Sequence, residues 1–387
     1  MSVRRQTLIL LRGTAGVGKT ALWHAMRREQ AHLIGVSVLQ EALAAGWSWL
    51  SLGQVNELVE TSDVSAGLMD AFGGKDYLVV DGCVHTEVLA AAAPLTCAVV
   101  RLWCFARPWL IEARRRSRVS QPGPAYDCEL AEYIVQSQHV MPYVRDIFVD
   151  TSEYPVRRIT QETALSMMQP AERSSVELTE IAKQYQQCLR IDGEWHGSTD
   201  SARQEFEQER LERILPADMA GATVLDIGAS DGGFCYEAFN RGAIYATACE
   251  VDAGRCALMR YVRDARQLPL TVAEINAVGP TLPRRYNNED DALYDYGLLL
   301  NVLHHCDDPA PLLREVMGCC QRVTVETPFA TGLKPVRLAD GPYPNALCLP
   351  PAWVEAVAGG FGFDVAGIRV SNMAAGSRLI YELHRRT

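Results

Sequence analysis

Short apolar runs alternate with stretches of helical spacing along most of this 387-residue chain. In the first part, apolar runs occur at 7–12, 76–81, 97–106 and 146–150, and each has a length suited to a buried parallel strand. A helical pattern follows residue 19, and polar or helical segments separate the other runs. This alternation predicts an α/β domain with a doubly wound parallel sheet.

A second set of apolar runs follows with the same alternation. Its four strands are expected at 223–227, 242–250, 270–273 and 295–300. A helix is expected at 234–241, after the first of these strands. The pattern in the last part of the chain predicts a helix at 353–358 and two strands at 363–370 and 377–384. The alternation therefore predicts the fold class α/β, with two doubly wound domains in series.

The segment between the two sets is less apolar. A helical pattern covers 176–189, and the turn formers that follow place Trp195 and His196 in a loop. The expected organisation is a first domain, a linker with a lead-in helix and loop, and a second domain, at 1–165, 166–200 and 201–387.

An octapeptide after the first strand reads Gly-Thr-Ala-Gly-Val-Gly-Lys-Thr, the full G-x-x-x-x-G-K-[ST] pattern of a P-loop. Gly13, Gly16 and Gly18 would turn backbone N–H groups towards the phosphates of ATP. Lys19 would reach the β- and γ-phosphates, and Thr20 would ligate Mg²⁺. The strand before the motif and the helix after it are the context that this chemistry needs.

Further charged residues in the first domain suit phosphoryl transfer. Asp81 ends an apolar run, as in a Walker B strand, and would hold Mg²⁺ through water or act as a base. Its alternative role is to cap a following helix. Arginines after the next strand fit a kinase lid, which neutralises charge on the transferring group, or else a solvated basic face. The lid candidates are Arg114, Arg115, Arg116 and Arg118.

Residues 5–165 resemble the nucleoside, nucleotide and polynucleotide kinase-like group of P-loop proteins, most specifically at the P-loop. The resemblance implies an acceptor site within residues 32–50. There Trp47 or Trp49 would stack on a ring or belong to the core, and Glu41 would orient the substrate.

The first strand of the second domain ends in a glycine-rich turn, Gly-Ala-Ser-Asp-Gly-Gly, at 228–233. Such a turn lets the backbone pass close to the methionine part of S-adenosylmethionine (SAM). Asp226, just before the turn, would hold the methionine amino group. The cofactor contacts expected in the turn are Gly228, Ala229, Ser230 and Gly232.

Three strand ends after the turn complete the expected SAM site. Glu250, at the end of the second strand, would accept from the ribose hydroxyls, with Asp252 as the alternative. Glu274 follows the third strand, where the adenine edge is read. Asn301, after the fourth strand, would line the pocket that holds the methyl acceptor.

His304 and His305 follow Asn301, and either would act as general base towards an acceptor hydroxyl, because a neutral imidazole titrates near working pH. Both histidines have a structural role as the alternative. Glu326, at the end of the next strand, is a weaker acceptor-site candidate. Consecutive residues rarely converge on one ion, so no metal site is expected here.

The run Asn-Val-Leu-His-His-Cys-Asp-Asp-Pro at 301–309, followed by Val-Thr-Val-Glu-Thr-Pro, resembles the methyltransferases related to the enzyme that completes the 5-oxyacetyl modification of wobble uridine in tRNA. The resemblance covers residues 175–330. It implies a class I fold with SAM as the donor. His304 stands where that family has an aromatic residue, and ordinary methyl transfer is the expected reaction.

Charge and cysteine content indicate which class of substrate and which cellular location to expect. Residues 1–165 carry 16 basic and 17 acidic side chains, whereas the rest carries 21 and 30. The acidic second part favours a small substrate over a nucleic acid. The 12 cysteines form no C-x-x-C pair, no leader precedes an apolar segment and no long apolar run occurs. A cytoplasmic protein without a membrane span, disulfide framework or zinc site is expected.

The leading hypothesis is a bifunctional enzyme, an ATP-dependent kinase fused to a SAM-dependent methyltransferase, acting on a small metabolite or a natural-product or nucleoside-like intermediate. The first alternative is an RNA or tRNA end- or base-modifying enzyme, which the lid arginines and the wobble-uridine resemblance favour. The second is a methyltransferase with a regulatory nucleotide-binding domain.

Overall fold

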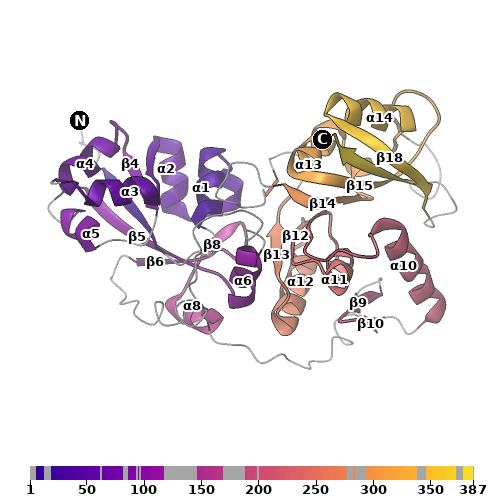
Figure 1. Ribbon diagram of the computed structural model, residues 1–387, viewed down its shortest axis with the longest axis horizontal. Coiled ribbons are helices and arrows are strands. Elements are labelled where there is room, and N and C mark those ends of the chain that lie inside the picture. Colours follow the sequence, from indigo (N-terminus) through magenta and orange to yellow (C-terminus); the bar gives the residue numbers. More distant parts are fainter. Residues whose placement is uncertain are drawn as a thin grey trace. The chain divides into compact units, whose positions relative to one another are not determined.

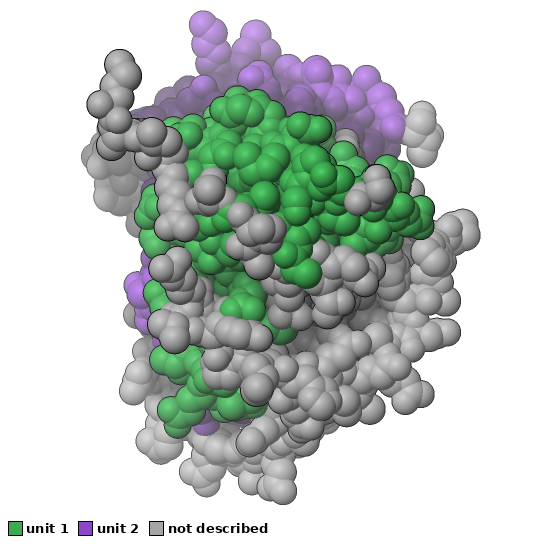
Figure 2. Space-filling view, turned by 90° about the vertical axis from the view of Figure 1, so that its left-hand side faces the viewer, with its two compact units in different colours: residues 1–170 green, residues 171–387 purple. Residues whose placement is uncertain are grey.

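The computed structural model divides into two compact units, residues 1–170 and 171–387, called unit 1 and unit 2 (Figure 2). Each unit is described by itself. The structure describes residues 6–12, 19–61, 63–81, 86–92, 95, 97–116, 146–168, 188–197, 200–276, 282–283, 293–337, 346–371 and 378–386.

Unit 1 is built on a sheet with the strand order β2-β8-β6-β5-β1-β4-β3. Neighbouring strands are parallel except β6 and β8. The strands are β1 (Thr7–Arg12), β2 (Ile34–Gly35), β3 (Trp47–Leu50), β4 (Tyr77–Asp81), β5 (Ala98–Phe105), β6 (Asp146–Asp150) and β8 (Val156–Ile159), with a two-residue β7 at Glu153–Tyr154. The chain places β4 on one side of β1 and β5 on the other. This reversal is a topological switch point, and ligands of open α/β sheets bind at the carboxyl ends of such strands.

Helices connect the strands of unit 1 (Figure 1). Alternate residues of two central strands, Leu8 and Leu10 with Leu78 and Val80, share one hydrophobic cluster with residues of α3, α4 and α5. The two-residue period of a strand puts these side chains on one face of the sheet. The helices are α1 (Lys19–Arg27), α2 (Ser37–Ala45), α3 (Leu52–Val59), α4 (Val64–Ala71), α5 (Thr86–Ala92), α6 (Pro108–Arg116) and α8 (Gln161–Met168).

In unit 2, the main sheet has the strand order β18-β19-β15-β14-β11-β12-β13. The strands from β15 to β13 are parallel, whereas β19 and β18 run antiparallel to their neighbours. The strand order reverses between β11 and β14, which is the switch point of this sheet. The strands are β11 (Thr223–Ile227), β12 (Tyr245–Glu250), β13 (Leu270–Glu274), β14 (Tyr294–Leu300), β15 (Cys320–Pro328), β18 (Phe363–Val370) and β19 (Arg378–Arg385).

The helices of unit 2 begin with recognisable signals. α11 starts after Gly232, whose φ of +83° suits glycine, and Asp252 caps α12 by accepting from the Arg255 amide at 2.8 Å. A hairpin of β9 (Leu189–Ile191) and β10 (Glu194–His196) packs on α11. The helices are α10 (Ser201–Ile214), α11 (Gly233–Asn240), α12 (Ala253–Arg266), α13 (Ala310–Cys319) and α14 (Pro351–Gly360), and two-residue strands β16 and β17 lie at Val336–Arg337 and Leu347–Cys348.

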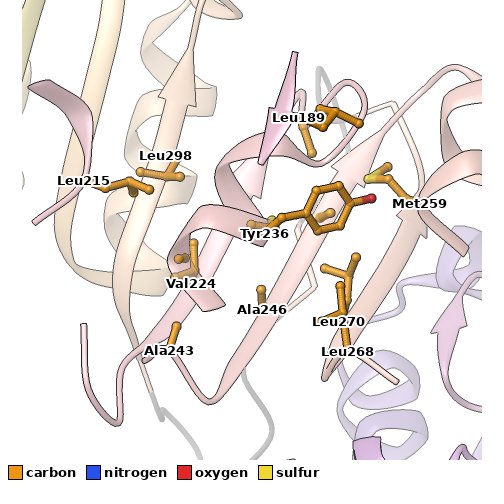
Figure 3. Packing of buried hydrophobic residues seen from close by; sticks show 14 of the residues in the cluster. Leu189, Leu215, Val224, Tyr236, Ala243, Ala246, Met259, Leu268, Leu270 and Leu298 are labelled. Atoms are coloured by element: carbon orange, nitrogen blue, oxygen red, sulfur yellow. The ribbon is translucent and has the colours of Figure 1, made fainter. Parts of the chain in front are cut away.

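One hydrophobic cluster joins the hairpin, α10, α11, α12 and the sheet of unit 2. Figure 3 shows the ring of Tyr236 beside Met259, with Leu189 of the hairpin above it. Tyr236 and Met259 are almost completely buried, at 1% and 0% exposure. This packing fixes α11, and with it the turn that leads from β11 into that helix.

Most strands predicted from the apolar runs are confirmed within one to three residues, including the reversed pair β18 and β19. The prediction of a loop around Trp195 and His196 is wrong, because both residues lie in β10. The turn-forming residues around this short strand predict a loop. Its antiparallel pairing with β9 makes it a strand. The predicted helix at 176–189 falls mostly outside the described residues.

We expect Met259→Ala to destabilise unit 2 by about 2–5 kcal/mol, because it leaves a cavity beside Tyr236. Val251→Ala is the matched control, since Val251 is 66% exposed and its loss should cost less than about 0.5 kcal/mol. Urea unfolding followed by the far-ultraviolet signal measures both. Equal unfolding midpoints for the two variants would contradict the packing described.

Candidate functional site

The turn after β11 lies at the switch point of unit 2. Gly228, Ser230 and Gly232 have φ values of +72°, +54° and +83°. A Cβ atom at Gly228 would lie 2.5 Å from Cγ2 of Val302, in the loop after β14. Glycine is therefore needed at position 228, where the two loops of the switch point approach each other.

Asp226 lies beneath this turn and is only 1% exposed. Burial raises the pKa of its carboxyl group to about 7, although a hydrogen bond from the Cys235 thiol at 3.6 Å favours the charged form. The carboxyl group lines a cavity and titrates near neutral pH. A cationic ligand group beside it would favour the ionised form.

Glu250 ends β12 and is fixed by backbone amides. Its Oε2 accepts from the Ser230 amide at 2.9 Å, and its Oε1 accepts from the Val251 and Asp252 amides at 2.8 and 2.9 Å. The carboxylate therefore joins the end of β12 to the glycine turn. Asp252, the alternative considered from the sequence, is exposed and caps α12.

Two adjoining cavities, of about 480 and 500 Å³, lie around the switch point. We call them the acceptor compartment and the nucleoside compartment, after the ligands that are proposed for them below. Both are lined by Gly228, Arg255, Leu300, Asn301 and His305. The acceptor compartment adds, among others, Arg190, Arg210, Asp226, Phe234, His304 and Arg378. The nucleoside compartment adds Cys249, Glu250, Val251, Ile275, Asn276 and Val302.

Glu274 ends β13, next to the nucleoside compartment. Its Oε2 accepts from the Arg260 guanidinium at 2.9 Å. Ile275 and Asn276, the next two residues, line the cavity. The role of Glu274 at an adenine edge remains a prediction.

Asn301 lies between the two compartments in a left-handed conformation, with φ of +61°. Its side-chain amide donates to Oε2 of Glu326 at 2.7 Å, and its Oδ1 accepts from Arg378. Glu326 is fully buried and also accepts from Arg210 at 2.8 Å and from the hydroxyl of Ser371. These contacts link α10, the loop after β14, β15, and the two ends of the segment that joins β18 to β19.

Arg210 and Arg378 are site residues that the sequence reasoning missed. They are 5% and 3% exposed, and both line the acceptor compartment. No local sequence pattern marks them, because Arg210 belongs to a polar helix and Arg378 is the first residue of a strand. Glu326 was considered from the sequence as an acceptor-site residue, and its carboxylate accepts from both Arg210 and Asn301.

His304 and His305 lie with their ring centroids 4.0 Å apart. Burial lowers the pKa of His304 to about 4, and the nearby charges of His305 and Arg378 act in the same direction. Its Nδ1 is buried and finds no hydrogen-bond partner among the described residues. A neutral imidazole with a vacant nitrogen is suited to accept a hydrogen bond, and His305 is exposed.

In unit 1, Lys19 and Thr20, the last two residues of the P-loop sequence, form the start of α1. The glycines Gly13, Gly16 and Gly18 lie outside the described residues. Asp81 ends β4 in register with Leu11 of β1. Burial raises the pKa of the Cys104 thiol on β5 to about 12, while the charge of Lys19 lowers it and that of Asp81 raises it. Both charges therefore act on one buried thiol at the switch point.

The other candidates of unit 1 have the following places. Arg114 is 6% exposed and donates to the Thr151 carbonyl at 2.8 Å. Arg115 and Arg116 end α6, and Arg118 lies outside the described residues. The rings of Trp47 and Trp49 are half-buried and 6.0 Å apart, and Trp49 also contacts Trp23 of α1. The hydroxyl of Tyr77 donates to Glu41 at 3.4 Å.

Several general features concern the described parts of the chain. None of the described helices is both long and apolar enough to cross a bilayer. No three described His, Cys, Asp or Glu residues cluster as metal ligands would. The cysteines in the described ranges are buried, and none of them forms a disulfide.

No protein-family model and no curated protein matches the sequence. Similar solved structures include a SAM-dependent methyltransferase from Mesorhizobium loti, with 16% identity and a TM-score of 0.36 over 46% of this chain and 97% of that chain. Magnesium protoporphyrin IX methyltransferase from Synechocystis PCC 6803 with bound SAH (S-adenosylhomocysteine) has 15% identity and a TM-score of 0.37, over 49% of this chain and 89% of that chain. The 1,6-didemethyltoxoflavin-N1-methyltransferase from Burkholderia thailandensis has 14% identity and a TM-score of 0.36, over 43% of this chain and 72% of that chain. Similarity at these values assigns this chain no family and no activity.

We expect the buried Asp226 to make stability depend on pH. Its folded pKa of about 7 lies above the ordinary value of 3.8, so the unfolded chain loses this proton first as pH rises. Stability is therefore lost between about pH 4 and 7, by a few kcal/mol. Asp226→Asn removes this titration, and its advantage in the free energy of unfolding should grow from pH 5 to pH 8. A constant difference across this range would contradict the shift.

Proposed function

We propose that unit 2 is a SAM-dependent methyltransferase. The observation that carries the proposal is the glycine turn after β11, held by Glu250 and bordered by two compartments that share Asn301. A cofactor with a nucleoside at one end and an amino acid at the other suits such a divided cavity. The positive φ at Gly228 favours glycine at this point of the turn, and Gly228 lines both compartments.

Each part of SAM would have a partner in this site. The carboxylate of Glu250 would accept from the ribose hydroxyls, and the backbone of Ile275 and Asn276 would border the adenine. Asp226 would accept from the methionine ammonium group, with the turn residues Gly228, Ala229, Ser230 and Gly232 beside it. SAM would supply a methyl group bound to a positively charged sulfur.

The residues after β14 would receive the acceptor. Asn301 would orient the reacting groups between the compartments, since Glu326 and Arg378 hold both ends of its amide. His304 would take the proton of an acceptor hydroxyl or amine, because it lines the acceptor compartment and its imidazole is neutral. His305 is exposed, its ring centroid lies 4.0 Å from that of His304, and it would pass the proton to solvent.

We propose that unit 1 is an ATP-dependent phosphotransferase. The support is the P-loop sequence after β1, together with the charges of Lys19 and Asp81 that act on the same buried Cys104. Lys19 would bind the transferring phosphate, and Thr20 and Asp81 would hold Mg²⁺. Arg114 and Arg118 remain lid candidates, although Arg114 is already buried against a backbone carbonyl.

The proposed substrate of both units is a small metabolite or a natural-product or nucleoside-like intermediate. The acidic excess of the second part supports it over an RNA. The likeness of 301–309 to the wobble-uridine methyltransferases supports the RNA alternative. A gel shift with RNA that weakens steeply with salt would favour that alternative, because phosphate contacts release counterions.

Calorimetric titration with SAM and with S-adenosylhomocysteine (SAH) tests the methyltransferase proposal. Glu250→Gln should weaken SAH binding at least tenfold, because the amide loses acceptor capacity for the ribose. Asp252→Asn is the matched control two residues away, and we expect it to leave the affinity within about threefold. The SAM site proposed here would be refuted by wild-type protein that binds neither ligand, or by a larger effect at Asp252.

Titration with Mg²⁺-ATP tests the phosphotransferase proposal. Lys19→Ala should abolish ATP binding and leave SAH binding unchanged, while Lys75→Ala removes an exposed lysine of the same unit as control. ATP binding that survives Lys19→Ala would contradict the P-loop assignment. ATP binding without turnover on any acceptor, combined with methylation that responds to ATP, would support the regulatory alternative.

A further inference from the structure

A third cavity of unit 2, of about 640 Å³, is formed by the turn of the β9–β10 hairpin and the second halves of α10 and α11. We call it the outer cavity. Of the described residues that line it, only Arg190 also lines one of the two compartments at the switch point. The charged and amide side chains in its lining include Arg190, Asp192, Gln208, Glu212, Glu237 and Arg241.

Two guanidinium groups of the outer cavity share one buried carboxylate. Glu237 is 2% exposed, and its Oε1 accepts from Nε of Arg241 at 2.8 Å and from Nη1 of Arg190 at 3.3 Å. The side chain of Arg241 is 10% exposed, and its Nη1 donates to the carbonyls of Leu215 and Pro216. Within the described parts of the chain, Nη2 of Arg190 and Nη2 of Arg241 have no hydrogen-bond partner. This wall therefore keeps a positive charge and vacant donors.

Negative charge lies on the wall that α10 contributes. Glu212 is exposed, and its Oε1 accepts from the neutral amide of Gln208 at 2.7 Å. None of the described cations forms an ion pair with Glu212. Both α10 and α11 end beside the cavity, and the carboxyl end of a helix attracts cations. This wall therefore suits a positively charged group.

One cavity with a positive wall and a negative wall suits a ligand that carries both charges. A carboxylate can accept two parallel hydrogen bonds from guanidinium groups, and an ammonium group has three donors for carboxylate and amide oxygens. A simple anion would leave Glu212 unpaired, and a simple cation would lie beside Arg190 and Arg241. Because unpaired charges out of water are costly, a zwitterion is favoured over either.

We propose that the outer cavity is a second ligand site of unit 2 and binds a free α-amino acid. The carboxylate of the ligand would accept from Nη2 of Arg190 and Nη2 of Arg241, and its ammonium group would donate to Glu212. A volume of about 640 Å³ leaves room for a side chain. The site is separate from the proposed SAM site, and the methyltransferase function is not needed for it.

Arg190 connects the outer cavity to the acceptor compartment, because its side chain lines both. The same two helices also border both cavities. Arg210 of α10 and Phe234 of α11 line the acceptor compartment, whereas Glu212 and Arg241 line the outer cavity. A bound amino acid would hold Arg190 towards the outer cavity, and would thereby contact a residue of the acceptor compartment wall.

The test is calorimetric titration of the SAH-saturated full chain with each of the standard protein amino acids, since SAH fills the amino-acid part of the proposed SAM site. We expect at least one of them to bind saturably. The amine that lacks its carboxylate and the acid that lacks its amino group should each bind about tenfold more weakly, because each loses one charged contact. An analogue that binds as tightly as the amino acid would overturn the proposal.

Variants locate the site. Arg190→Gln should weaken the amino acid about tenfold, and Glu212→Gln, at a more exposed contact, about threefold. Two controls remove the same charges elsewhere in unit 2 and should leave the affinity unchanged. Arg386→Gln changes a side chain that is 53% exposed, and Glu205→Gln changes an exposed residue of α10.

Arg190→Lys keeps a charge beside Glu237 and serves if the glutamine variant does not fold. It should weaken the amino acid about threefold, because an ammonium group lacks the planar pair of donors. The site is refuted if no amino acid saturates the SAH-loaded wild type, or if Arg190→Gln and Arg386→Gln bind the amino acid equally well. A wild type that does not bind SAH would refute the proposed methyltransferase, and the same titrations of the ligand-free chain and its variants would still test the outer cavity.

Discussion

The fully buried carboxylate of Glu326 is the constraint on which the acceptor side of unit 2 depends. An ionised carboxylate without partners cannot remain in a protein interior, so its neighbours must supply both charge and hydrogen bonds. Arg210 supplies the charge from α10, and Asn301 and Ser371 supply donors from two loops. Segments separated by more than one hundred residues are thereby held at one point, and Asn301 is oriented between two compartments.

Sheet topology explains why the remaining groups meet there. In both units the chain reverses its strand order beside a central strand, at β1 and at β11, and the carboxyl ends of parallel strands open onto one edge. Asp226, Glu250 and Asn301 are residues at or just beyond three such ends. In unit 1 the same rule places Asp81 beside the strand that leads to Lys19. Each proposed site therefore uses a place that the fold provides.

The sequence predicted those parts of the fold and site that depend on local patterns. Apolar runs identified the central parallel strands but not the short strands β2 and β3. The glycine turn located Asp226 and Gly228, which line a cavity, because strand, turn and helix are contiguous. Arg210 and Arg378 could not be found in this way, because their partners are distant in the sequence. Arg210 binds Glu326, more than one hundred residues away, and Arg378 binds Asn301 in the loop after β14. The strand at Trp195 was missed because its pairing, and not its composition, makes it a strand.

The way Asn301 is held limits how this protein can evolve. Its backbone is left-handed, and its side chain both donates to Glu326 and accepts from Arg378. Aspartate would lack the donor, glycine would lack both groups, and most other residues would resist the backbone conformation. Position 301 is therefore expected to stay fixed, and new acceptor specificities would arise by substitution at other residues that line the acceptor compartment.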